Sequence, residues 1–215
     1  MKAEKVLARV NDILMITDAS TNTALELQEF IKELKEQVRR EYAASTGKAS
    51  VAKAMREITE LPRKEGRGIG LQYAWMDNKG RQCVCDGYRA VRLINPVPLE
   101  ERPEEAKIPL DLDKVVPNIH HDYSATPLPT KAELKAFIAT EKALHGRKYD
   151  PIWYIVDGEI AVNAQYLLTL IEALPDATEI YYNNTYDGWK KPLYIQSASG
   201  DAVLLAVNLH KHQEE

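Results

Sequence analysis

Apolar residues recur at helical spacing through the N-terminal part of the chain. The spacing predicts helices over residues 2–16, 24–44 and 50–61. The longest of the three carries charged residues opposite an apolar stripe, which is the pattern of a helix packed on one side only. That stripe consists of Leu25, Leu27, Ile31, Leu34 and Val38. Pro62 is expected to end the third helix, because proline lacks the N–H that a helix interior needs.

The pattern changes from helical spacing to short strand-like runs after Gly66. Strands are predicted over residues 69–76, 82–85 and 88–94. The turns between them, at 77–80 and at Asp86-Gly87, have the composition of hairpin turns. Three prolines and a cluster of acids then mark a linker over residues 95–107.

The second half of the chain repeats this alternation of single helices with runs of strands. A short strand is predicted at 108–112 and an irregular stretch at 117–129. Thr130 and Glu133 form a capping-box pattern before a helix over 131–145. The following elements are strands at 151–156 and 159–162, a helix over 164–174 capped by Asn163 and closed by Pro175, and strands at 178–183, 193–197 and 202–207.

Runs of strands interrupted by single helices predict an α+β fold, with antiparallel sheets and helices on one face. Helix and strands repeat as a unit at 50–94 and again at 159–207. The expected organisation is a helical N-terminal extension over 1–47, a first unit with its linker over 48–107, and a C-terminal domain over 108–215.

Composition and charge narrow the class of protein. Hydrophobic residues make up 45% and charged residues 28% of the 215 residues, as in ordinary globular proteins. No apolar run approaches the roughly 18–20 residues of a membrane span, and the charged start leads into no signal core, so a cytoplasmic location is expected. Residues 35–67 hold nine basic and five acidic side chains, whereas residues 149–215 hold ten acids and three lysines. Such asymmetry is compatible with a polyanion-facing side, and equally with a solvated helix surface of mixed charges.

No residue pattern supports a metal or a cofactor. Cys83 and Cys85 are two apart on a predicted strand and so share a face, which indicates reduced core thiols. A single Cys-x-Cys is only half of a zinc site. Two adjacent histidines, His120 and His121, would point in opposite directions on a strand, so a joint site with Asp122 is not expected.

No motif supports catalysis either. Residues 45–50 lack the phosphate-loop pattern, because Tyr42 stands where the first glycine belongs and Ala49 where Ser or Thr is required. The glycines of 66–70 have the wrong spacing for a nucleotide site. The chain is therefore expected not to be an enzyme. The aromatic segment 181–189 is compatible both with stacking on a peptide or base and with a partly buried hairpin.

Three C-terminal segments together resemble a known family. They are Asn163-Ala164-Gln165-Tyr166-Leu167-Leu168, Pro192-Leu193-Tyr194-Ile195 and Ala202-Val203-Leu204-Leu205-Ala206-Val207. In this order they resemble the closing βαβββ unit of bacterial sliding clamps, the processivity subunits of replicative DNA polymerase. Leu205 and Ala206 stand where that family has Met-Pro. Cys85-Asp86-Gly87-Tyr88-Arg89-Ala90-Val91 is similar to the family's Thr-Asp-Gly-His/Tyr-Arg strand turn, whereas the first 45 residues match nothing in it.

The resemblance implies a DNA-clamp-like fold and a non-enzymatic role in DNA replication or recombination, with a phage or prophage source as a further expectation. A clamp holds duplex DNA through phosphates without reading bases. The expected partners are duplex DNA, replication or recombination proteins, and another copy of the chain; no membrane or cofactor is expected. The alternative is a protein-interaction module that keeps the fold and does not encircle DNA. Candidate DNA contacts are Lys53, Arg56, Lys131, Lys135, Lys142, Arg147 and Lys148.

Overall fold

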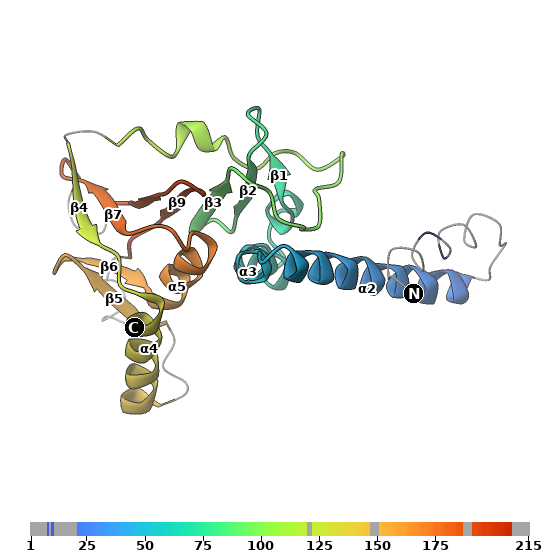
Figure 1. Cartoon of the computed structure of the whole chain (residues 1–215), viewed down its shortest axis with the longest axis horizontal. Coiled ribbons are helices and arrows are strands. Elements are labelled where there is room, and N and C mark those ends of the chain that lie inside the picture. The colour runs from blue at the N-terminus through green and yellow to red at the C-terminus, as the bar shows by residue number, and fades with distance from the viewer. Residues whose placement is uncertain are drawn as a thin grey trace.

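A computed structural model describes residues 8, 10, 21–119, 122–146, 151–186 and 191–207. Its main element is a seven-stranded sheet in the order β1-β2-β3-β9-β8-β7-β4, in which every neighbouring pair is antiparallel (Figure 1). Helices cover one face of this sheet. The predicted α+β class is confirmed. None of the described helices combines the length and the apolar composition that a bilayer span requires.

Two of the predicted N-terminal helices are present, and the predicted helix over 2–16 lies almost wholly outside the described residues. Helix α2 covers Thr21–Ser45 and projects away from the sheet (Figure 1). Helix α3 covers Ala49–Lys64 and contains Pro62, so the prediction that this proline ends the helix is wrong. Pro62 lies in the last turn of the helix and is buried.

The strands β2 (Gln82–Cys85) and β3 (Arg89–Leu93) form the predicted hairpin. The strand predicted over 69–76 is largely wrong. A 3-10 helix occupies Ile69–Gln72, and only β1, Trp75–Met76, pairs with β2. The side chain of Gln72 donates to the backbone oxygen of Arg67 and closes this turn, which competes with extended pairing.

The stretch from 95 to 127 differs most from the sequence expectation. The predicted strand at 108–112 is absent, and a 3-10 turn, η2, covers Leu112–Lys114. Conversely, strand β4 (Tyr123–Pro127) lies inside the stretch predicted to be irregular, and it pairs with β7. β4 is an edge strand of the sheet. The missing N–H of a proline at its end therefore breaks no hydrogen bond to a further strand.

The C-terminal elements follow the predictions closely. Helix α4 covers Lys131–His145 and begins with the complete capping box of Thr130 and Glu133. Asn163 caps helix α5 by accepting from the N–H groups of Gln165 and Tyr166. The remaining elements are β5 (Trp153–Val156), β6 (Ile160–Asn163), α5 (Ala164–Ala173), β7 (Glu179–Asn183), β8 (Leu193–Gln196) and β9 (Gly200–Leu204).

Strands β5 and β6 form a separate two-stranded sheet, fastened to the main sheet through side chains. The hydroxyl of Tyr182 on β7 donates to Asp157 in the β5–β6 turn, and Lys191 donates to Glu159. β6, α5, β7, β8 and β9 follow one another as the predicted βαβββ unit.

Pairing of β3 with β9 joins strands of the first and last parts of the chain in one sheet. Alternation along β3 gives the sheet two distinct faces. Arg89 and Val91 point toward the helices, and Ala90 and Arg92 point to the opposite face.

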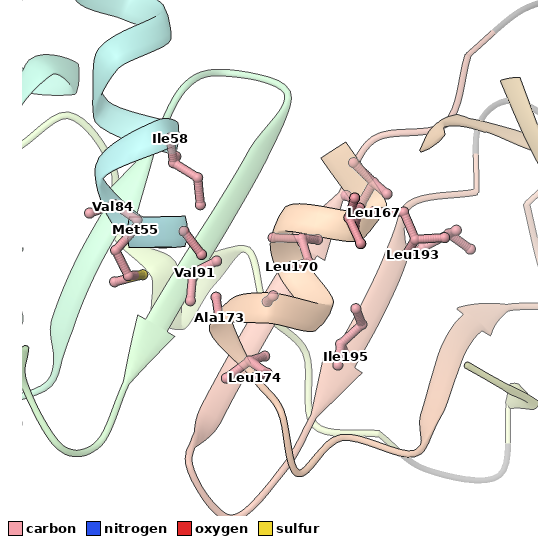
Figure 2. Close-up of a cluster of buried hydrophobic side chains, with 14 of the residues drawn as sticks. Met55, Ile58, Val84, Val91, Leu167, Leu170, Ala173, Leu174, Leu193 and Ile195 are labelled. Carbon is pink, nitrogen blue, oxygen red and sulfur yellow. The ribbon is translucent and has the colours of Figure 1, made fainter. Parts of the chain in front are cut away.

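The main core lies between the helices and the sheet (Figure 2). Met55 and Ile58 of α3 are fully buried there, as are Leu167, Leu170 and Leu174 of the α5 segment. Strands contribute Val84, Val91, Leu193 and Ile195 to the same cluster (Figure 2). Burial of each such side chain stabilises the fold by about 1.5–3 kcal/mol, so α5 is held mainly by its leucines.

A second, smaller apolar cluster lies on the other face of the sheet. It contains Trp75, Cys83, Cys85, Ala90, Tyr194 and Val203 of the strands and Leu112 of η2. This face is covered by the chain between β3 and β4, which includes η2, rather than by an α-helix (Figure 1).

Candidate DNA-binding surface

Helices α3, α5 and α4 form a layer in which α5 packs against both others. The layer carries seven lysines and arginines against five glutamates. Every one of the basic residues lies on α3 or α4, because α5 contains none. The candidate contacts from α3 and α4 thus flank a central helix without positive charge.

Lys131 and Lys135 on α4 are brought together by one carboxylate. Their ammonium groups lie 2.9 Å and 3.3 Å from the same oxygen of Glu172 on α5. Burial alone would raise the pKa of Glu172, but the hydrogen bonds and charges of the two lysines outweigh it and hold the pKa below its ordinary value. Glu172 is therefore charged at neutral pH. Its one negative charge offsets one of the two positive charges that Lys131 and Lys135 could present to a DNA phosphate.

The two candidate contacts on α3 differ in whether their charges are already paired. Arg56 donates to Glu36 of α2 over 2.9 Å, so its charge is already paired. Lys53 is exposed and has no ion pair among the described residues, and the same holds for Lys142 on α4. A hollow of about 480 Å³ between α2 and α3 is lined by Arg40, Ala43, Ala49, Lys53, Arg56, Glu57 and Glu60.

The remaining two candidates, Arg147 and Lys148, lie outside the described residues. So do His120 and His121, and within the described ranges there is no group of three His, Cys, Asp or Glu side chains that could hold a metal ion.

A stack of arginines and tyrosines was missed by sequence reasoning. The Arg67 guanidinium lies 4.4 Å from the centre of the Tyr88 ring, and Tyr88 stacks on Tyr166 with 5.8 Å between ring centres. Arg89 lies 4.3 Å from the Tyr166 ring. The stack runs from Arg67 and the half-exposed Tyr88 to the buried Arg89, and joins the turn after α3, the β2–β3 hairpin and α5.

Asp86 fixes the buried end of this stack. The carboxylate is fully buried, accepts from the Arg89 Nε over 2.9 Å, and also accepts from the backbone N–H groups of Tyr88 and Arg89. Within the described residues, Arg89 Nη1 has no hydrogen-bond partner, and its Nη2 lies 3.7 Å from Glu57. The signal in the sequence is the Asp-Gly-Tyr-Arg string, whose aspartate by itself predicts only turn geometry.

The two cysteines are free and buried on the face opposite the helices. Burial raises the pKa of Cys83 to about 12 and that of Cys85 to about 11. Because the thiolate is the reactive form, we expect both to react slowly with a bulky thiol reagent in native protein and rapidly after denaturation in urea. Fast native labelling of both thiols, or stoichiometric bound zinc, would contradict this prediction.

Comparisons with known proteins give a distant match. No protein-family model matches the chain, and no curated protein does so. The solved structure titled "Caulobacter crescentus pol III beta" is 14% identical, with 63% of this chain and 57% of that chain covered and a TM-score of 0.40. The DNA polymerase III beta subunit of Thermotoga maritima is 16% identical, with 60% and 41% covered and a TM-score of 0.32.

Both matches are to the replicative subunit that the C-terminal residues resemble. This chain spans only about half the length of the two matched chains. Both TM-scores lie below 0.5 and both identities below 25%, so the similarity is distant and assigns no site, activity or partner to this chain.

Proposed function

We propose that this chain is a non-enzymatic, clamp-like protein of DNA replication or recombination, and that it contacts duplex DNA through its helix layer. The observation that carries the proposal is the arrangement of α3 and α4 on either side of α5, with Lys53, Lys131, Lys135 and Lys142 exposed at the surface. A cytoplasmic location and a phage or prophage source belong to the same proposal.

The charges of the layer set the expected strength of binding. Glu172 and Glu36 pair three of the candidate cations, so little net charge faces the DNA. Each phosphate neutralised by a free Lys or Arg releases counterions and adds about −0.9 to the slope of log K against log salt. Affinity should therefore be weak, independent of sequence and salt-dependent.

The direct test is a fluorescence-anisotropy titration of the full chain with two duplexes of unrelated sequence at about 50 mM salt. Equal affinities that fall with added salt support the proposal. If neither duplex binds and the chain runs as a monomer, the DNA-holding function fails.

Removing the central carboxylate should strengthen DNA binding. Glu172→Gln frees Lys131 and Lys135, and we expect roughly tenfold tighter binding near 50 mM salt with a salt slope steeper by up to about 1.8. The loss of these half-exposed ion pairs should lower stability by less than about 1 kcal/mol.

The matched control is Glu179→Gln, which removes the same charge on β7. Glu179 accepts from Tyr181 and belongs to the face of the sheet opposite the helices. Equal gains in both variants would show that only net charge matters and would contradict a role for the helix layer.

A protein-interaction module that does not encircle DNA is the second candidate function. The observation that favours it is Tyr88, which is 42% exposed and held by the stack with Arg67 and Tyr166. The exposed Leu205 lies beside it, since its N–H donates to the Tyr88 carbonyl. A rigid aromatic side chain next to an exposed leucine suits an apolar anchor of a partner protein.

A further inference from the structure

The segment 108–119, here called the strap, covers the apolar face of the sheet without joining it. None of its described residues is in a strand, and its backbone-to-backbone hydrogen bonds are local ones around η2. The Pro117 carbonyl also accepts one hydrogen bond from the Gln196 side chain of β8 over 3.3 Å. Leu112 and Val116 are the only residues of the strap that are buried. Leu110, Val115 and Ile119 pack against the sheet cluster while only partly buried. The strap therefore has no ladder bonds and few fully buried side chains.

Among the described residues, the ion pairs between the strap and the sheet all go to one carboxylate at the surface. Asp113 lies 2.9 Å from Lys79, 2.7 Å from Arg81 and 2.6 Å from Arg92. The hydrogen bonds of Lys79, Arg81 and Arg92 hold the pKa of Asp113 well below its ordinary value, against an opposing effect of desolvation.

The cations on the sheet side have other partners when Asp113 is absent. Arg92 is also bound to Asp201 over 2.8 Å, and Arg81 to Asp77 over 2.6 Å. Loss of the Asp113 carboxylate would thus release the strap while the buried Arg92 stays paired.

We propose that the strap opens as a unit, with Asp113 as its latch, while the helices and the sheet stay folded. Segments with few buried apolar contacts and with tethers at the surface open at a lower free energy than the whole domain. Opening uncovers Cys83, Trp75 and Tyr194, so the strap conceals an apolar sheet face. This inference does not depend on DNA binding.

The two thiols under the strap report its opening. The experiment measures the labelling rate of Cys83 and Cys85 in the full-length native protein with an aromatic disulfide reagent at pH 8, in urea concentrations below the unfolding transition. Opening of the strap alone exposes little surface, so the rate should depend only weakly on urea, whereas global unfolding gives a steep dependence.

Three variants distinguish labelling through strap opening from labelling through global unfolding. Asp113→Asn should accelerate labelling about tenfold or more. Lys114→Gln, at a neighbouring lysine with 82% side-chain exposure, is the control and should leave the rate roughly unchanged. Leu170→Ala weakens the core on the other face of the sheet, and it should lower the urea midpoint without a matching rise in labelling.

The proposal is overturned if labelling follows the global stability of every variant, with Leu170→Ala the fastest and Asp113→Asn no faster than Lys114→Gln. If Asp113→Asn does not fold, Lys79→Gln takes its place, because it removes one latch contact at an exposed lysine. An intermediate acceleration then supports the latch, and an unchanged rate rejects it.

Discussion

Replacing Asp86 with alanine is expected to lower the free energy of unfolding by about 3–5 kcal/mol. The carboxylate is fully buried, and it is the closest partner of an arginine whose side chain is only 2% exposed. Without it, Arg89 keeps its contact with the Tyr166 ring and the distant contact with Glu57 at 3.7 Å, and two backbone N–H groups lose their acceptor. Urea unfolding followed by circular dichroism measures the loss.

A double variant tests whether the unpaired charge causes this loss. Asp86→Ala with Arg89→Met removes both charges, so no unpaired cation is left buried. We expect the double variant to be more stable than Asp86→Ala alone. A double variant that loses the sum of both single effects would show that the turn geometry, and not the ion pair, dominates.

Gly200→Ala is expected to prevent stable folding, with a loss of more than about 4 kcal/mol. A Cβ at this position would overlap the carbonyl oxygen of Arg92 and come within 3.1 Å of the Leu93 Cα. Both neighbours are backbone atoms of β3, which cannot move aside without breaking the pairing that joins β3 to β9.

Gly68→Ala is the control, because nothing lies within 4 Å of its Cβ position and its φ of −47° suits alanine. The soluble yield and the urea midpoint of both variants check this prediction. A Gly200→Ala protein as stable as Gly68→Ala would contradict the close packing of β3 and β9.

The sequence predicts an element well where local signals agree with its place in the fold. Helix α4 has its capping box at Thr130 and Glu133, and α5 lies between Asn163 and Pro175, so both ends are encoded locally. The errors fall where long-range contacts decide. β4 contains Ala125 and Pro127, residues that are depleted in strands, and it forms because β7 supplies a pairing edge.

Much of the candidate surface could not be derived from local sequence for the same reason. The lysines of α4 are visible as a charged helix face, but their pairing with Glu172 requires α5 to lie beside α4. Likewise Asp86 reads as a turn residue, and only the packing of α5 on β3 shows that it fixes a buried arginine. Charge patterns therefore predict candidate contacts, whereas tertiary packing decides which charges are free.

The central claim, that the helix layer contacts DNA, is tested most directly by the salt slope of binding. Lys53→Gln with Lys142→Gln removes two exposed lysines that have no ion pair among the described residues. Charge reversal of Lys131 or Lys135 is less suitable, because it would place a second carboxylate against Glu172.

The comparison variant, Lys107→Gln with Lys114→Gln, removes the same charge outside the layer. The measurement is duplex affinity by anisotropy between about 50 and 200 mM salt. The helix-layer variant should lose about 1.8 from the magnitude of the log–log slope, about 0.9 for each lysine, while the comparison variant keeps roughly the wild-type slope. Equal slopes in the two variants, or no binding by the wild-type chain at the lowest salt, would contradict the claim.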